Sequence, residues 1–228
     1  MPDHGKMDIN FQKILDDPLI PKIPVSLLFL NENRDPFSSI SEIPHHQVLG
    51  RGSSGAVYKL FLEESQGSGK LIAVALKVLH CAESTDLDEF YNEIKLLSSL
   101  KHPHVVSFFG VCLLDSETIS LVTEFSPLGS LDRLLSNPEF FENISLLHRI
   151  RMALDIAEAM AFLHSCQPVV LHRDIKSSNI LLDSSLRAKI ADLGISTLKP
   201  TKESARSMTV KIGMFFFLLL TFLLSYCF

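Results

Sequence analysis

One polar segment, Leu171–Asn179, constrains the fold of this chain more than any other feature. It reads Leu-His-Arg-Asp-Ile-Lys-Ser-Ser-Asn and lies between two apolar stretches. A carboxylate (Asp174), an ammonium group (Lys176) and a carboxamide (Asn179) follow one another closely in it. Together these groups can accept a proton, neutralise negative charge and hold a hard metal ion. The segment therefore predicts a loop whose residues serve chemistry rather than packing.

A glycine-rich segment, Leu49–Val57, lies upstream. Its glycines at Gly50, Gly52 and Gly55 let backbone N–H groups lie close over phosphates, where a Cβ atom would clash. The same spacing marks dinucleotide-binding folds, in which a helix follows the loop directly. Residues 56–62 are instead rich in β-branched, aromatic and other apolar residues, and they predict a strand. The pattern favours a strand–loop–strand cover.

An apolar strand that carries one lysine is predicted at Leu71–Leu79. The ammonium group of Lys77 is costly to bury unless an anion pairs with it. The candidate anions, Glu89 and Glu93, lie in residues 86–100, whose apolar positions recur with helical spacing. The alternative interpretation is a surface lysine on an edge strand.

Two further segments follow in order. Leu121–Leu131 is an apolar strand that leads into a Pro/Gly turn, and Asp192-Leu193-Gly194 follows the strand-like residues 180–182 and 188–190. Each is typical of an ordinary strand or turn when it is taken alone. Their order after the other segments makes both informative, because an ordered set of motifs lowers the risk of a chance match.

Taken together, these segments resemble the eukaryotic protein kinases. Leu171–Asn179 is similar to the family's H-R-D-x-K-x-x-N loop, Leu49–Val57 to its G-x-G-x-x-G-x-V loop, and Leu71–Leu79 to its V-A-I-K strand. Asp192-Leu193-Gly194 stands where the family has D-F-G. Lys176 lies two residues after Asp174, and a lysine at this position makes the loop resemble the serine/threonine type. Ser130-Leu131, and Asp183 after Leu182, resemble the corresponding residues of the tyrosine-kinase-like group.

The resemblance implies an α+β, bilobal, protein kinase-like fold over residues 42–212. We expect a complete N-lobe, with a five-stranded antiparallel sheet and one helix, and a partial, mostly helical C-lobe. Within that C-lobe, Ser145–Ser165 predicts a helix that supports the catalytic loop. Its apolar face is expected to consist of Leu147, Ile150, Leu154, Ile156, Ala157, Met160 and Leu163. Residues 1–41 form an extension, expected to be irregular or partly strand-like, whose function the sequence does not indicate.

The resemblance also implies a role for each site residue in ATP- and Mg²⁺-dependent transfer of the γ-phosphate to serine and threonine hydroxyls of a protein substrate. Asp174 would be the base, Lys176 would steady the γ-phosphate, and Lys77 paired with Glu93 would position the nucleotide. Asn179 and Asp192 would bind magnesium. Thr123 would be the gatekeeper, and Glu124 to Ser126 would supply backbone contacts to adenine. The predicted nucleotide contacts are Leu49, Gly50, Gly52, Gly55, Val57, Ala75, Lys77, Glu124, Ser126 and Leu181. A homologous kinase is a further candidate partner.

Composition bears on the partners of the chain and on its cellular compartment. The net charge of −5 gives no case for nucleic acid as a partner. The four cysteines are scattered, without a C-x-x-C pair, which indicates free thiols in a reducing compartment and favours the cytoplasm. The first residues hold no basic segment followed by an apolar one, so a signal peptide is not expected.

The end of the sequence departs from the family pattern. No A-P-E motif follows Asp192, and Ile212–Phe228 is a run without a charged residue. Three interpretations of residues 213–228 stay open: a membrane anchor of about the minimum length, a misplaced core helix, and translated non-coding sequence. The departure also motivates an alternative function, a truncated non-catalytic module that binds nucleotide or a partner as a decoy.

Overall fold

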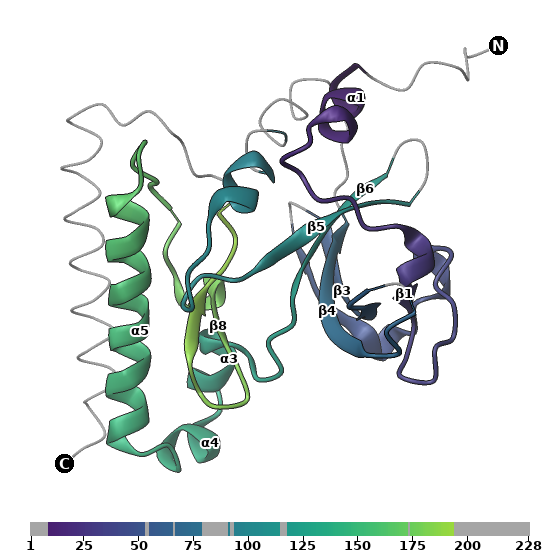
Figure 1. The fold of residues 1–228 in the computed structure, drawn as a ribbon. Coiled ribbons are helices and arrows are strands. Elements are labelled where there is room, and N and C mark those ends of the chain that lie inside the picture. Colours follow the sequence, from purple (N-terminus) through teal and green to yellow (C-terminus); the bar gives the residue numbers. More distant parts are fainter. Residues whose placement is uncertain are drawn as a thin grey trace. The chain divides into compact units, whose positions relative to one another are not determined.

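The computed structural model describes residues 9–52, 55–65, 67–78, 91, 94–114, 118–172 and 174–193 (Figure 1). The chain divides into two compact units. The first unit comprises residues 1–100 and 107–125, and the second comprises 101–106 and 126–228. Glu89, Glu93 and residues 194–228, including the predicted membrane anchor, lie outside the described residues.

The first unit contains the predicted antiparallel sheet, with one strand more than expected. Its order is β1-β3-β4-β6-β5, and β2 pairs with β3. The five expected strands are present and every pairing is antiparallel. The sixth strand, β1, comes from the extension. The strands are β1 (Leu28–Phe29), β2 (Val48–Gly52), β3 (Gly55–Glu63), β4 (Leu71–Val78), β5 (Phe108–Leu113) and β6 (Ile119–Glu124).

Hydrophobic clusters cover both faces of this sheet. On one face Val74, Leu76 and Val78 of β4 pack with Leu28 and Phe37 of the extension. On the other face β5 and β6 supply a second cluster, whose buried members are Ile14, Ile20, Ile94, Val111, Ile119 and Leu121. Because side chains alternate along a strand, one sheet can bury both sets at once.

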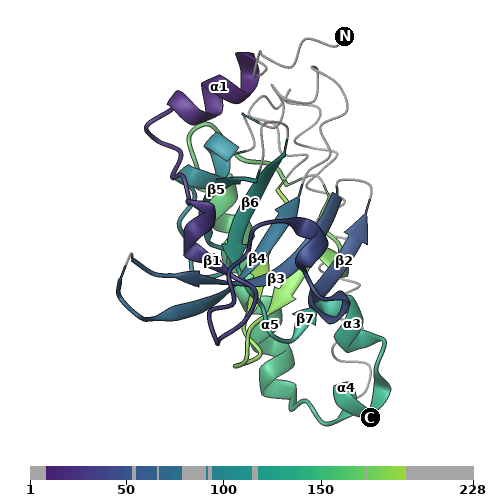
Figure 2. The ribbon, with the colours of Figure 1, turned by 90° about the vertical axis from the view of Figure 1, so that its right-hand side faces the viewer.

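The extension runs along the sheet rather than away from it. Its described part starts with helix α1 (Ile9–Asp16) and contains the 3₁₀ turn Val25–Leu27. Two further 3₁₀ turns, Ile40–Glu42 at the end of the extension and His45–Gln47 after it, precede β2. Between α1 and β1 it follows β5, where Lys22 forms a parallel bridge with Val111. Figure 2 shows α1 beside the end of β5. Residues that were expected to be irregular or partly strand-like thus include a helix and a strand.

The second unit has a small sheet and several helices. The sheet has the order β7 (Gly129–Ser130), β8 (Ile180–Leu182) and β9 (Ala188–Ile190), and both pairings are antiparallel. The predicted strands at 180–182 and 188–190 are confirmed. The helices are α3 (Leu131–Leu135), α4 (Pro138–Glu142) and α5 (Leu146–Ser165), and a 3₁₀ turn spans Ser177–Asn179.

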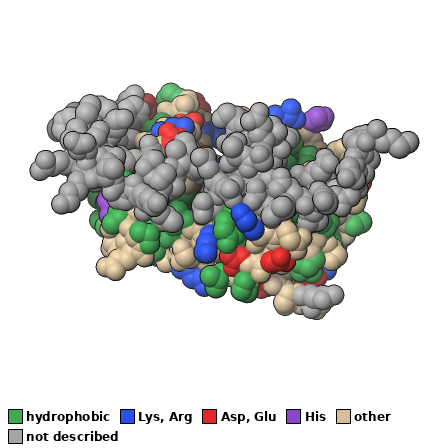
Figure 3. Space-filling model, turned by 90° about the horizontal axis from the view of Figure 1, so that it is seen from above, with side chains coloured by type: hydrophobic (Ala, Val, Ile, Leu, Met, Phe, Trp, Pro, Cys, Tyr) green, Lys and Arg blue, Asp and Glu red, His purple; other side chains and the backbone are tan. Residues whose placement is uncertain are grey.

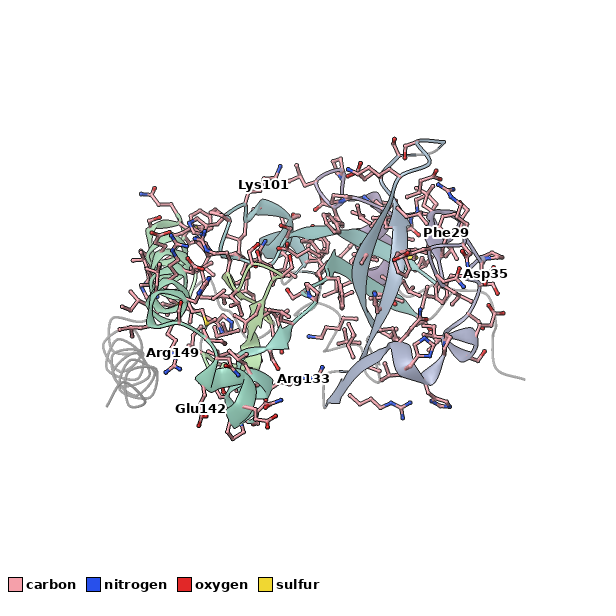
Figure 4. The ribbon with its side chains drawn as sticks, turned by 90° about the horizontal axis from the view of Figure 1, so that it is seen from below. Phe29, Asp35, Lys101, Arg133, Glu142 and Arg149 are labelled. Carbon is pink, nitrogen blue, oxygen red and sulfur yellow. The ribbon has the colours of Figure 1, made fainter. Side chains whose placement is uncertain are left out.

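The predicted helix at Ser145–Ser165 is confirmed as α5. Ser145 is its N-cap, and the Ser145 hydroxyl accepts a hydrogen bond from the backbone N–H of His148. Arg149 lies near the start of the helix (Figure 4), where its Nε donates to the carbonyl of Ile144 at 3.0 Å.

The apolar face expected for α5 is wrong in part. Ile156, Met160 and Leu163 are buried as expected, but Leu147, Ile150 and Leu154 are 56, 47 and 55% exposed. The helix carries apolar side chains on more than one face, so its periodicity alone cannot tell which stripe is buried.

The surface of the described residues is mixed in character. On the face seen in Figure 3, hydrophobic, acidic and basic side chains are interspersed. No helix within the described ranges is long and apolar enough to cross a bilayer.

Candidate functional site

The glycine-rich segment forms the hairpin between β2 and β3. Gly52 pairs with Gly55 and Arg51 pairs with Ala56 in antiparallel register. Gly55 has a φ of 124°, a conformation that L side chains rarely adopt, which explains a glycine at this position. The predicted strand–loop–strand arrangement is therefore confirmed, although Ser53 and Ser54 at the tip lie outside the described residues.

Four predicted nucleotide-binding residues share one face of the first unit's sheet. Val57 is the cross-strand partner of Lys77, and Ala75 is the partner of Thr123. All four side chains are half-buried, whereas the adjacent Tyr58, Leu76 and Val122 are buried on the opposite face. Strand pairing thus brings residues far apart in the sequence side by side. The pairing of Lys77 with Glu93 stays a prediction, because Glu93 is not among the described residues.

Glu124 fixes the end of β6. Its backbone N–H donates to the carbonyl of Ser107 at 2.9 Å, and its Oε1 accepts from the Ser107 N–H at 2.6 Å. Sequence reasoning assigned only backbone contacts to Glu124 and missed this role of the side chain. In the second unit, the carbonyl of Ser126 accepts from the Gly129 N–H at 3.1 Å. Both predicted adenine-contacting positions are thus held by hydrogen bonds.

In the second unit, two predicted site residues, Lys176 and Asn179, contact a third, Asp174. Lys176 Nζ lies 2.6 Å from Asp174 Oδ2. The Asn179 side-chain amide donates to the Asp174 carbonyl at 2.8 Å and to Oδ2 at 3.1 Å. The hydrogen bond from Lys176 is the largest cause that lowers the pKa of Asp174, and the same contact raises the pKa of Lys176. Both groups are therefore charged at neutral pH.

His172 ties this loop to the residues before Asp192. Its Nε2 lies 2.8 Å from the Ala191 carbonyl, and its Nδ1 accepts from the Asp174 N–H at 3.3 Å. A carbonyl can only accept, so Nε2 carries the proton. Burial lowers the pKa of His172, which favours this neutral tautomer. His172 belonged to the motif but was not predicted as a positioning residue.

Asp192 follows β9 in a strained conformation. Its φ is 58°, in the left-handed region that costs a non-glycine residue about 1 kcal/mol or more. The Ala191 N–H donates to the Asn179 carbonyl at 2.9 Å, so the two predicted magnesium ligands are linked through the backbone. The next residue, Leu193, is buried as expected for an apolar replacement of Phe. Leu181, the remaining predicted nucleotide contact, is half-buried on β8.

A buried carboxylate on α5 holds the β8–β9 hairpin. Asp155 Oδ2 accepts from Arg187 Nε and from the Ala188 N–H, each at 2.9 Å, and Oδ1 accepts from Arg187 Nη2 at 2.7 Å. Asp155 is 1% exposed. Its hydrogen bonds are the largest cause that raises the pKa of Arg187. Because β8 begins after Asn179 and β9 ends before Asp192, this contact positions both predicted magnesium ligands.

His104 completes the contact on the far side of β9. Its Nδ1 lies 3.1 Å from the Ala188 carbonyl, and its Nε2 lies 3.2 Å from Arg187 Nη2. Because the Ala188 carbonyl can only accept, Nδ1 carries the proton of this contact. The Ile190 N–H also donates to the His104 carbonyl at 2.9 Å. Sequence reasoning missed Asp155, Arg187 and His104.

The donor set of the second unit fits a hard cation. The Asn179 amide nitrogen is turned toward Asp174, which leaves the carboxamide oxygen for a ligand. Asp192 adds an exposed carboxylate. Oxygen donors from a carboxylate and an amide are those that Mg²⁺ prefers.

Comparison with known proteins adds an independent finding. The sequence model of the family described as protein tyrosine and serine/threonine kinase matches residues 43–216. Wall-associated receptor kinase 4 of Arabidopsis thaliana is 39% identical over 165 residues, which are 72% of this chain and 21% of that protein. Dual specificity protein kinase shkC of Dictyostelium discoideum is 39% identical over 160 residues, 69% of this chain and 30% of the relative. The chain thus spans under a third of the length of these relatives.

Proposed function

Because this chain belongs to the family of protein tyrosine and serine/threonine kinases, we propose that it transfers the γ-phosphate of ATP to serine and threonine hydroxyls of a protein substrate. The observation that carries the proposal is the arrangement of Lys176 and Asn179 around the Asp174 carboxylate. Such a transfer depends mainly on positioning and on stabilising charge, and these residues supply both.

In this proposal Asp174 accepts the proton of the substrate hydroxyl. Its lowered pKa keeps the carboxylate ionised at neutral pH, so it is ready to orient the hydroxyl by a hydrogen bond. Lys176 steadies the γ-phosphate as the negative charge redistributes. The hydrogen bond from the Asn179 amide to Asp174 Oδ2 keeps the carboxylate in place before the substrate arrives.

ATP and magnesium are the proposed cofactors. Bound Mg²⁺ would neutralise charge on the phosphates, and Asn179 and Asp192 would hold it through oxygen atoms. In the first unit, Lys77 would contact the α- and β-phosphates and the β2–β3 hairpin would cover them. Val57, Ala75 and Thr123 share the sheet face with Lys77, which supports a common role in binding the nucleotide.

Serine and threonine are the proposed acceptors. The support is Lys176, which is typical of serine/threonine kinases, and the name of a further relative. That relative, probable serine/threonine-protein kinase drkB of Dictyostelium discoideum, is 36% identical over 178 residues. The name dual specificity kinase for another relative makes tyrosine an acceptor to be tested as well.

The test is transfer of radiolabelled γ-phosphate to peptide libraries that contain serine, threonine or tyrosine as the sole acceptor. We expect the chain to label serine and threonine peptides, and Asp174→Asn to lose at least a hundredfold in rate, within the range of general base catalysis. Equal rates for the two proteins would contradict the assignment of the base. Nucleotide binding without transfer would favour the non-catalytic binding module instead.

A cytoplasmic location is also a proposal. Its support is that Cys112 and Cys166 are free thiols. Burial raises the pKa of the Cys112 thiol to about 12, so it stays protonated and unreactive. Attachment of residues 212–228 to a membrane would make the protein membrane-associated. Fractionation of cells that express the chain with and without these residues tests that attachment.

A further inference from the structure

Lys59 lies on the sheet face that carries the predicted nucleotide-binding residues. It is the cross-strand partner of Ala75, and Ala75 is in turn the partner of Thr123. Lys59 also follows Val57 by two positions, so the alternation of side chains along β3 puts both residues on the same face. Its side chain is half-buried there. No nucleotide contact was predicted for this lysine.

Two aromatic rings hold the ammonium group of Lys59. Its Nζ lies 5.1 Å from the centre of the Phe61 ring and 4.9 Å from the centre of the Phe125 ring. Both distances fall within the roughly 6 Å over which a cation is attracted to the face of a ring. Among the described residues, no carboxylate forms an ion pair with Lys59. The two rings are therefore the contacts that fix the position of this charge.

The contact between Lys59 and Phe125 spans a strand. The sheet order places β4 between β3, which carries Lys59, and β6, which ends one residue before Phe125. Neighbouring strands lie about 4.8 Å apart, so the lysine has to extend across β4 to reach the ring. Ala73 and Ala75 face the same side of β4 with only a methyl group each, which leaves room for the lysine side chain. One side chain thus connects strands that do not pair directly.

Phe125 directly follows Glu124, the predicted adenine contact at the end of β6. On the side of β5, the hydrogen bonds to Ser107 hold Glu124. On the side of β4 and β3, Lys59 holds the ring of the next residue. The end of β6 is therefore restrained from both sides, and the peptide group between Glu124 and Phe125 is restrained with it.

We propose that Lys59 is a positioning residue for the adenine-contacting backbone at Glu124, and that it acts by clamping the Phe125 ring. Its effect on nucleotide binding is then exerted at the adenine end of the site and not on the charged phosphates. This inference rests on the proposed kinase function for its consequence, whereas the contact itself is independent of that function.

Proton NMR tests the contact without any nucleotide. Ring currents should shift the ε-methylene protons of Lys59 upfield, and Phe125→Leu should move them part of the way back, because Phe61 still shields them. The matched control is Lys70, which is 67% exposed and pairs with Glu64, so its ε-methylene protons should keep their ordinary shift in both proteins. An unshifted Lys59 signal, or one that Phe125→Leu leaves unchanged, would overturn the contact.

Binding of adenosine tests the positioning role, because adenosine carries no phosphate. Lys59→Met keeps the apolar stem and removes the charge, and we expect it to weaken adenosine binding about two- to fivefold, as for a cation–π contact at a partly exposed site. A non-hydrolysable ATP analogue should lose the same factor. Lys59→Arg should keep binding near the wild-type level, since a guanidinium also stacks on aromatic rings. The control variant Lys70→Met removes an exposed lysine and should change neither affinity.

The same titrations define what would overturn the positioning role. Unchanged adenosine binding in Lys59→Met would do so, and a loss confined to the ATP analogue would show that the charge acts on the phosphates directly. A Lys59→Met loss that is undiminished in the Phe125→Leu background would show that the lysine does not act through this ring. Failure of the wild-type chain to bind adenosine would contradict the proposed function and this role together, whereas the NMR result would still decide the contact.

Discussion

In the first unit, strand alternation and apolar packing place the candidate nucleotide residues, whereas in the second unit hydrogen bonds between side chains and backbone place the candidate catalytic residues. Val57, Lys77 and Thr123 lie together because their strands pair in one register. Asp174 and Asn179 lie together because the Asn179 amide donates a hydrogen bond to Asp174 Oδ2. The first arrangement tolerates a change of side chain that keeps its volume, and the second does not.

This difference predicts that substitutions lower stability for different reasons in the two units. Loss of an apolar group in the first unit should lower stability in proportion to the cavity that it leaves. Loss of one polar partner in the second unit should leave another buried polar group without its bond.

The largest effect is expected at Ile20. Ile20→Ala empties a site that is 1% exposed, and it should lower the free energy of unfolding by about 3 kcal/mol. The matched control is the neighbouring Leu19, which is 66% exposed. Leu19→Ala should change the free energy of unfolding by less than about 0.5 kcal/mol. Urea unfolding measures both. Similar losses for the two variants would show that the extension is not packed as described.

A somewhat smaller effect is expected at Asp155. Asp155→Ala removes three acceptor contacts and should destabilise the protein by about 2 kcal/mol, a value reduced because the Arg187 side chain is 45% exposed. In addition, Mg²⁺ should enhance nucleotide binding less, because the β8–β9 hairpin is no longer held.

The control for Asp155 is Glu63→Ala in the first unit. It also removes a carboxylate that is paired with an arginine, Arg34, at 3.0 Å. Glu63→Ala should lower stability without changing the effect of Mg²⁺ on nucleotide binding. An Asp155→Ala variant with an unchanged Mg²⁺ effect would limit Asp155 to a structural role.

The pKa of Asp174 should depend on Lys176. Because the lowered pKa means that the ionised form is favoured in the folded state, Asp174 contributes stability above its ordinary pKa of 3.8, and this contribution is lost as the pH falls through the lowered value. Lys176→Met should raise the pKa of Asp174 toward the ordinary value. A carbon-13 NMR titration of the carboxyl group measures the change, and an unchanged pKa would contradict the contact.

The smallest effect is expected on the exposed side of α5. Leu154→Gln should change the free energy of unfolding by less than about 0.5 kcal/mol, because Leu154 is 55% exposed. Ile156→Ala, on the buried side, should cost about 3 kcal/mol. Thermal unfolding of the two variants distinguishes the faces, and a large loss for Leu154→Gln would restore the face expected from the sequence.

Local patterns predicted the strands, and they placed Asp174, Lys176 and Asn179 close together. The β-branched and aromatic residues of β3 and the short apolar runs of β8 and β9 each lie within a few neighbouring positions of the sequence. Asp174 and Asn179 are also close in the sequence. Contacts between distant residues were not predictable in this way. Asp155 and Arg187 are separated by 32 positions, and nothing near either residue indicates its partner.

The extension and α5 show the same limit. The fit of Pro21 against Gly110 depends on a backbone approach that leaves no pattern in the sequence of the extension. In α5, the periodicity correctly predicted a helix but not which apolar stripe is covered, because that choice depends on what packs beside it.

Calorimetric titration with a non-hydrolysable ATP analogue, with and without Mg²⁺, tests the central claim most directly. We expect the wild-type chain to bind the analogue and Mg²⁺ to tighten this binding. Lys77→Met in the first unit should weaken binding under both conditions, whereas Asp192→Asn in the second unit should remove only the tightening by Mg²⁺. Absence of binding by the wild-type chain, or full tightening by Mg²⁺ in Asp192→Asn, would contradict the account.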